Sequence, residues 1–295
     1  MGGSPIGGSR AAFGYEVPAG RAYATIRATF ESGINFLDTS NNYGDGESER
    51  RIGKVLADRG GLPEGFVLAT KADRDSVTGD FSGGRIRRSA EESLGRLGLE
   101  RFQLYYLHDP EYASFAEATA PGGAVEALVA LREEGIAEHI GVAGGPVSLL
   151  LDFLDLDVFE VVLTHNRFTL VDRSAEPLLD AAAARGVGVV NAAVHGGGIL
   201  ARGASHTDRY AYRPASPEVL RRIATMEQIC GRRGVPLRTA ALQFSLREPR
   251  FCSTVVGVSS PEHVQDLVDM AAAELPDDLF EELAPLAAPR EQWLG

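Results

Sequence analysis

The stretch Gly33-Ile34-Asn35-Phe36-Leu37-Asp38-Thr39-Ser40-Asn41-Asn42-Tyr43-Gly44 decides the fold, because it contains a complete transition from strand to loop. Its apolar run, 34–37, predicts a short strand, and the run ends in the carboxylate of Asp38. Tyr43 follows in a polar loop, and a helix is predicted over 48–58. A buried strand that ends in a carboxylate and opens into such a loop presents chemical groups at its C-terminal end.

This pairing of a strand with a following helix repeats along the chain. Short runs rich in Val, Ile and Leu are typical of strands that are buried on both faces. We predict strands at 34–37, 66–71, 102–107, 140–143, 158–164, 187–191 and 254–257. We predict helices at 19–32, 48–58, 85–97, 123–134, 147–154, 176–185, 217–231, 237–246, 261–273 and 276–286, and a long loop at 194–216.

The rhythm of the elements favours an α/β protein with a (β/α)8 TIM barrel. Seven strands are clear, and we expect the eighth from the extreme N-terminus, where it is cut short. The whole chain, 1–295, is then a single barrel domain. A doubly wound sheet is the alternative, but it calls for Gly-x-Gly-x-x-Gly after an early strand, whereas this chain has Gly2-Gly3 and Gly7-Gly8.

Composition narrows the possible partners. The net charge is −12 and the pI is near 5.0, without a basic block, so nucleic-acid binding is not expected. The only cysteines, Cys230 and Cys252, predict no disulfide framework and fit a cytoplasmic protein. No apolar run reaches the roughly 18 residues of a membrane span. We therefore expect a cytoplasmic protein that does not bind membranes and is a monomer or a small homo-oligomer.

Three predicted strands end in ionisable residues, Asp38, Lys71 and His108, and Tyr43 follows the first of them. In a barrel, catalytic groups lie at the C-terminal ends of strands. A lysine ammonium beside a tyrosine lowers the pKa of the phenol, and a carboxylate holds the lysine charged. A histidine can donate a hydrogen bond to a carbonyl oxygen. The four residues together predict a general acid/base for interconversion of a carbonyl and an alcohol.

The residues around these four resemble the aldo-keto reductases. The resemblance lies in Asp38-Thr39-x-x-x-Tyr43-Gly44, in Ala69-Thr70-Lys71 and in Leu107-His108-Asp109-Pro110. It implies a (β/α)8 barrel with a nicotinamide cofactor, a small-molecule sugar or aldehyde substrate, Tyr43 as proton donor or acceptor, Lys71 and Asp38 tuning it, and His108 orienting the carbonyl. Gly2-Gly3-Ser4-Pro5-Ile6-Gly7 and 166–172 are similar to the branch of aldose 1-dehydrogenases and pyridoxal 4-dehydrogenase.

The same resemblance implies where the cofactor is held. The segment 257–263 matches the cofactor phosphate loop, and a helix N-terminus there suits a pyrophosphate. None of the positions where NADP-specific relatives carry Lys or Arg is strongly basic here, which favours NAD over NADP, although Arg202, Arg209 and Arg213 in the long loop are candidate phosphate contacts. The candidate cofactor-binding residues are His165, Asn166, Asn191, Gly257, Val258, Ser259, Ser260 and His263.

The sequence leaves several functions open. The first is an NAD(P)-dependent oxidoreductase, an aldose 1-dehydrogenase before a pyridoxal 4-dehydrogenase or a general aldehyde reductase. The second is a nucleotide-sensing barrel without turnover. A metal-dependent hydrolase is disfavoured, because the histidines show no paired-ligand spacing with carboxylates, so no metal is expected.

Overall fold

The computed structural model describes residues 1–8 and 15–295, which fall into two compact units. The first unit consists of Met1–Gly144, Asp152–Val162 and Gly257–Val268. The second consists of Gly145–Leu151, Leu163–Val256 and Asp269–Gly295. The expectation of a single domain over 1–295 remains a prediction.

The first unit is built on four parallel strands in the order β1-β2-β3-β4, which are Phe36–Asp38, Val67–Ala72, Phe102–His108 and Ala137–Gly144. Because the strands pair side by side in one direction, their C-terminal ends lie at one edge of the sheet. Asp38 pairs with Ala69, and His108 pairs with Ala143. The register therefore brings the ends of β1, β2 and β3 together, as the strand-end prediction required.

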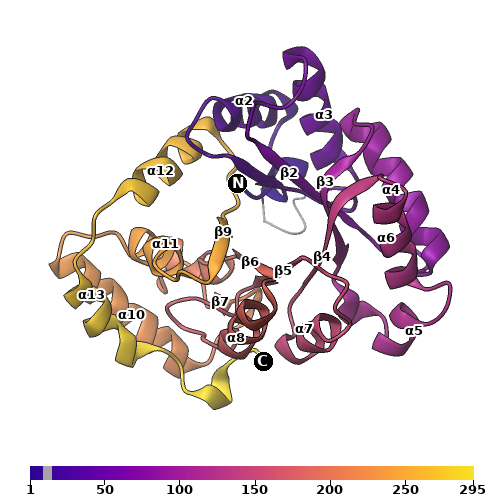
Figure 1. The fold of residues 1–295 in the computed structure, drawn as a ribbon. Helices are drawn as coiled ribbons and strands as arrows, with labels where there is room; N and C mark the ends of the chain where they lie inside the picture. The colour runs from indigo at the N-terminus through magenta and orange to yellow at the C-terminus, as the bar shows by residue number, and fades with distance from the viewer. Residues whose placement is uncertain (9–14) are drawn as a thin grey trace. The chain divides into compact units, whose positions relative to one another are not determined.

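Helices cover the outer face of these strands in Figure 1. Helix α3 contacts both α2 and α4, and α4 contacts α6. The apolar side of α3 is buried through Ile52, Val55 and Leu56. The helices of this unit are α2 (Ala19–Phe30), α3 (Glu47–Arg59), α4 (Gly83–Leu97), α5 (Phe115–Thr119), α6 (Ala124–Glu133) and α12 (Pro261–Ala272, partly in the second unit), with the short 3-10 helices η1 (Pro5–Gly7) and η2 (Pro110–Tyr112).

The N-terminal residues occupy the position of the missing strand. Gly2 forms isolated parallel bridges to Asp38 and to Gly257. The backbone N–H of Asp38 donates to the Met1 carbonyl at 2.9 Å, and the N–H of Gly3 donates to the Asp38 carbonyl at 2.7 Å. The expected first strand is thus reduced to a bridge beside β1.

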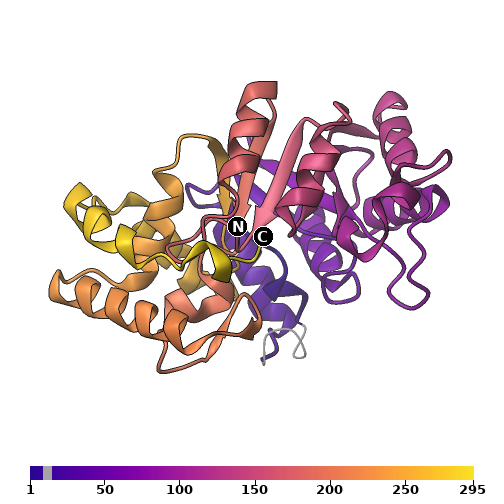
Figure 2. The same cartoon turned by 90° about the horizontal axis from the view of Figure 1, so that it is seen from below.

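The second unit holds strands β5 (Val161–His165, whose first two residues belong to the first unit), β6 (Gly188–Ala192) and β9 (Phe251–Val255). Figures 1 and 2 show the long helix α10, in orange, beside α13, and the two are in contact. Their shared core includes Ile223, Met226 and Leu279, which are all fully buried. The helices are α7 (Val147–Leu154, partly in the first unit), α8 (Glu176–Arg185), α9 (Ile199–Arg202), α10 (Pro217–Arg232), α11 (Leu237–Leu246) and α13 (Asp277–Leu283).

Two parts of the sequence prediction need correction. The stretch 194–216 is not an unstructured loop: it contains the 3-10 helix η3 (Gly196–Gly198), α9 and the antiparallel pair β7 (Arg209–Tyr210) and β8 (Arg213–Pro214). The region between β3 and α6 also forms η2 and α5, which has a complete capping box from Ser114 and Glu117. These elements are only two to five residues long, which is too short to show a periodic apolar pattern.

Within the described residues, none of the helices is both long enough and apolar enough to cross a membrane.

Candidate active site

The Tyr43 loop leaves β1 and is held from behind by the N-terminal segment. Gly44 has a φ of +62°, and a Cβ atom there would lie 2.2 Å from the Gly7 carbonyl oxygen. The backbones of the two glycines therefore approach as closely as only glycine permits. The Ser48 hydroxyl, at the start of α3, donates to the Gly3 carbonyl at 2.8 Å. The glycine-rich start of the sequence thus fixes the position of the loop that carries Tyr43.

Lys71 joins Asp38 to Tyr43. Its Nζ atom lies 2.6 Å from Asp38 Oδ1 and 2.6 Å from the Thr39 carbonyl oxygen, and it donates to Tyr43 Oη at 3.3 Å. The side chains of Lys71 and Asp38 are only 1% and 5% exposed, so this ion pair lies away from water. The ammonium also lies 4.7 Å from the centre of the Tyr43 ring. A cation held in this way stabilises negative charge on the phenol oxygen.

His108 ends β3 and meets the ring of Tyr43 edge to face, with ring centroids 5.7 Å apart. The chain turns sharply after it, because Asp109 adopts a φ of +45° and begins η2. All four residues predicted from the strand ends therefore gather in the first unit. Their catalytic roles remain a prediction.

A fifth ionisable side chain, Asp73, completes this group and was not predicted. Its Oδ1 atom lies 2.6 Å from His108 Nδ1, while Oδ2 accepts from the backbone N–H of Asn42 at 3.0 Å and from the Ser40 hydroxyl. Asp73 lies two positions beyond Lys71, and alternate residues of an extended segment share a face. The pair Lys71 and Asp73 was the available signal in the sequence.

The charges of this group shift one another's pKa. Burial alone would lower the pKa of His108, but the carboxylates of Asp73 and Asp109 outweigh it, and the pKa is raised above 6.5. Burial would raise the pKa of Asp73, but His108, Ser40 and the Asn42 N–H outweigh it, and the pKa is lowered. The two shifts favour the same state, an imidazolium beside a carboxylate.

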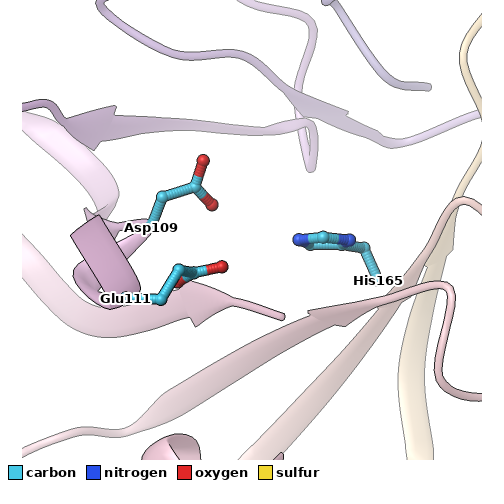
Figure 3. A group of neighbouring side chains, drawn as sticks. All are labelled: Asp109, Glu111 and His165. Carbon is cyan, nitrogen blue, oxygen red and sulfur yellow. The ribbon is translucent and has the colours of Figure 1, made fainter. Parts of the chain in front are cut away.

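Two carboxylates follow His108 in the chain, Asp109 just before η2 and Glu111 within it. Asp109 Oδ1 lies 3.6 Å from His108 Nε2. Figure 3 shows the side chains of Asp109 and Glu111, whose closest oxygens are within 4.8 Å of each other. The same figure labels His165, which ends β5 and belongs to the second unit. The carboxylate of Asp109 adds to the effect of Asp73 and favours the charged form of His108.

A second buried network supports the site from the side of α3. Glu49 is fully buried and accepts from the Thr70 hydroxyl at 2.6 Å and from Arg96 at 3.1 Å. Burial raises the pKa of Glu49, and the hydrogen bonds from Thr70, Ser93 and Arg96 oppose that rise. Arg96 also donates to the Asn41 carbonyl at 2.9 Å. The strand that carries Lys71 and the loop that carries Tyr43 are therefore tied to α3 and α4.

The segment proposed for the cofactor phosphates, 257–263, lies in the first unit and runs into the first turn of α12. The Ser260 hydroxyl accepts from the backbone N–H of His263 at 3.3 Å, and Ser259 Oγ lies 3.2 Å from His263 Nδ1. Gly257 is exposed, and its added Cβ would meet the Pro5 ring at 3.0 Å. Helix α12 is twelve residues long, so its free N–H groups fit a pyrophosphate, although the carboxylate of Glu262 stands in its first turn.

The remaining cofactor candidates lie in the second unit. Asn166 has a φ of +62°, is 1% exposed, and its Oδ1 atom has no hydrogen-bond partner among the described residues. An unpaired buried oxygen of this kind fits an amide N–H donor such as a nicotinamide carboxamide. The NH2 group of Asn191 donates to the Phe168 carbonyl at 3.0 Å and to Ser245 Oγ at 2.8 Å, while its Oδ1 atom, like that of Asn166, is buried without a hydrogen-bond partner among the described residues. His165 Nδ1 lies 3.1 Å from the Asn166 amide.

The chain is similar in sequence to proteins of known activity. The model of the Aldo/keto reductase family matches residues 2–288. The chain is 34% identical to D-threo-aldose 1-dehydrogenase of a Pseudomonas species, with 89% of this chain and 87% of that protein covered. It is 33% identical to L-galactose dehydrogenase of Arabidopsis thaliana, covering 91% and 82%. It is 29% identical to pyridoxal 4-dehydrogenase of Microbacterium luteolum, covering 95% and 91%.

The fold is also similar to that of a solved structure. The aldo-keto reductase AKR11C1 from Bacillus halodurans, in its holo form, superposes with a TM-score of 0.78 at 22% identity, covering 99% of this chain and 93% of that one. This likeness confirms the predicted (β/α)8 barrel class over the doubly wound alternative.

Proposed function

The chain belongs to the aldo/keto reductase family, an NAD(P)-dependent group of oxidoreductases, and from this we infer that it is an aldose 1-dehydrogenase. The contact of Lys71 Nζ with both Asp38 and Tyr43 Oη carries the chemical part of the proposal, because it places a phenol beside a buried cation. Two sugar dehydrogenases among the relatives at 33% and 34% identity support the aldose as the substrate class.

In this proposal each residue has one role at the substrate. The Tyr43 phenolate accepts the proton of the anomeric hydroxyl, and Lys71 stabilises the phenolate while Asp38 holds Lys71. His108 orients the same oxygen. As the O–H bond breaks, the C1–H bond breaks with its electron pair, and the second C1–O bond of the lactone forms. A bound nicotinamide supplies the hydride acceptor for this step.

We propose NAD as the preferred form. The residues before and within the first turn of α12 are Gly257, Ser259, Ser260 and His263, and the first turn has an acidic residue, Glu262. A 2′-phosphate is held most strongly by the planar fork of an arginine. Of these positions only His263 can carry positive charge. In this proposal Ser259 and His263 contact the adenosine end of the cofactor.

A substrate panel tests the proposal. Purified protein is assayed with aldoses, pyridoxal and simple aldehydes, with NAD and with NADP. We expect reduction of NAD with at least one aldose and a higher kcat/KM for NAD than for NADP. Turnover of pyridoxal alone would instead support the pyridoxal 4-dehydrogenase activity of the third relative. Nucleotide binding without turnover of any of these compounds would support a nucleotide-sensing barrel.

The Tyr43→Phe variant tests the proton acceptor. It removes only the phenol oxygen, and we expect kcat to fall by about 10²–10⁴, the usual contribution of a general acid or base. Cofactor affinity, measured by quenching of protein fluorescence, should change little. A Tyr23→Phe variant is a matched control, because it makes the same chemical change in α2 and not in the loop that carries Tyr43. Full turnover by Tyr43→Phe would exclude Tyr43 as the acceptor.

A further inference from the structure

The carboxylate of Asp73 is the starting point, because it contacts two catalytic elements at once. One of its oxygens lies 2.6 Å from His108 Nδ1, and the other accepts a hydrogen bond from the Asn42 backbone N–H at 3.0 Å. The Asp73 residue is 4% exposed, and the His108 side chain is 10% exposed. Both ends of this contact are thus shielded from water, and its geometry is set by backbone and side-chain partners rather than by solvent.

Because of the chemistry of imidazole, this contact fixes which ring nitrogen of neutral His108 carries the proton. A neutral histidine carries one N–H, and the other ring nitrogen can only accept. An ionised carboxylate also only accepts, so the N–H of a neutral His108 lies on Nδ1, towards Asp73. Nε2 then has a lone pair and no proton. It becomes a donor only when the ring takes up a second proton.

We propose, on the basis of the proposed function, that Asp73 is a positioning residue that fixes His108 in the Nδ1–H tautomer, so that His108 donates a hydrogen bond to the substrate oxygen only as an imidazolium. In the neutral state Nε2 presents a lone pair to that oxygen. It then repels a carbonyl oxygen and competes with Tyr43 for the proton of a hydroxyl. The site is productive while His108 is charged.

Several charged groups face the ring and set where it loses this proton. Asp73, at the end of β2, and Asp109, after β3, favour the charged form, whereas Lys71 on β2 opposes it. The edge of the Tyr43 ring meets His108 from the β1 loop. The carboxylates prevail, and the pKa of His108 lies above its ordinary 6.5. The productive, charged form therefore persists to a higher pH than it would in an unperturbed histidine.

Removal of the charge should abolish the constraint. In Asp73→Asn the amide has nearly the same shape but can also donate, through its NH2 group, to Nδ1. The neutral ring can then carry its proton on Nε2 and donate at any pH. The pKa of His108 should fall by about 1–3 units, as expected for loss of a close opposite charge. Ser40→Ala is the matched control, because it removes a hydroxyl that contacts both Asp73 and His108 Nδ1 and leaves the carboxylate in place.

Nitrogen NMR of the protein labelled in its six histidines tests this directly. Comparison with His108→Gln assigns the His108 signals. In the wild type and in Ser40→Ala we expect Nδ1 to stay protonated throughout the titration while Nε2 titrates. A neutral wild-type ring protonated on Nε2 would overturn the proposal, and so would an equal His108 pKa in the wild type and Asp73→Asn. The wild-type spectrum decides the tautomer even if Asp73→Asn does not fold.

Kinetics supply the second measurement. For reduction of a carbonyl substrate, kcat/KM of the wild type should fall about tenfold per pH unit above the His108 pKa, as for loss of one essential proton. Asp73→Asn should be flat over that range. A falling limb at the same pH in both proteins would overturn the proposal. Failure of every aldose, pyridoxal and aldehyde to react, with the expected NMR tautomer, would contradict the proposed function and leave the Asp73–His108 assignment standing.

Discussion

Lys71 is the residue on which the charges of the site depend. It is a cation at 1% exposure whose ammonium is shared by Asp38, Tyr43 and the Thr39 carbonyl. The second carboxylate oxygen of Asp38, Oδ2, is buried with no hydrogen-bond partner among the described residues. Asp38 thus relies on Lys71 for most of the compensation of its charge. The ion pair that the proposed function uses is therefore also expected to contribute to stability.

Replacement of Lys71 by Met should therefore destabilise the protein as well as inactivate it. The change leaves the Asp38 carboxylate buried and uncompensated, which costs about 3–5 kcal/mol of unfolding free energy. Urea unfolding measures this cost. The double variant Asp38→Asn/Lys71→Met should lose less than the sum of the two single variants, because both charges are gone. Additive losses would contradict a direct interaction between the two side chains.

At this scale the sequence predicted most of the group. Asp38, Lys71 and His108 were found because each ends an apolar run, and Tyr43 because it follows one in a polar loop. Asp73 escaped because it lies beyond its strand, in a stretch that reads as polar loop. Its partner is His108, on a different strand, and only the register of β2 and β3 brings the two within 2.6 Å.

Helices α3 and α4 show what sets the spacing between elements. Gly53 lies in α3, and a Cβ atom there would be 2.1 Å from the Arg96 carbonyl oxygen and 2.9 Å from Leu97 Cα. These atoms belong to the backbone of α4 or its end, so they cannot turn aside. The close approach also positions Arg96, which binds Glu49 and the Asn41 carbonyl.

The Gly53→Ala variant should accordingly lower the free energy of unfolding, by about 1–3 kcal/mol of overpacking. We expect the cost of overpacking to be larger than the gain of about 1 kcal/mol that comes from replacing glycine by alanine inside a helix. Gly95→Ala in α4 is the matched control: nothing lies within 4 Å of its added Cβ, so it should stabilise the protein. Chemical denaturation of both variants measures the difference. Equal stabilisation by both would show that α3 and α4 do not meet at Gly53.

Element boundaries followed the sequence closely where apolar periodicity was long. Helices α7, α8 and α11 have the predicted bounds, and each predicted strand is present within a few residues. The elements that the sequence did not predict are all short, with two to five residues each. β7 and β8 are two residues each and, within the described residues, form a sheet of their own, so their existence depends on a local turn and not on a buried face.

For the whole molecule, cofactor binding offers a test that does not depend on the substrate. A ligand that binds only the folded state stabilises it by about 2.7 kcal/mol at a concentration 100 times its Kd. We expect NAD to raise the Tm by several degrees, and NADP at equal concentration to raise it less. Calorimetry measures both. Equal shifts would contradict the preference for NAD, and no shift with either nucleotide would contradict the proposed cofactor site.

The bridge of Gly2 to both Asp38 and Gly257 has a consequence for biosynthesis. The ribosome releases Gly2 first and the 257–268 segment of the same unit near the end, and at ~5–20 residues per second the interval is on the order of tens of seconds. During that time β1 already has β2 and the N-terminal segment as neighbours, but the side of Gly2 that will meet Gly257 is open and can pair with other chains. The first unit is therefore completed only once its 257–268 segment has been synthesised, and the yield of folded protein should depend on chaperones that cover this edge in the meantime.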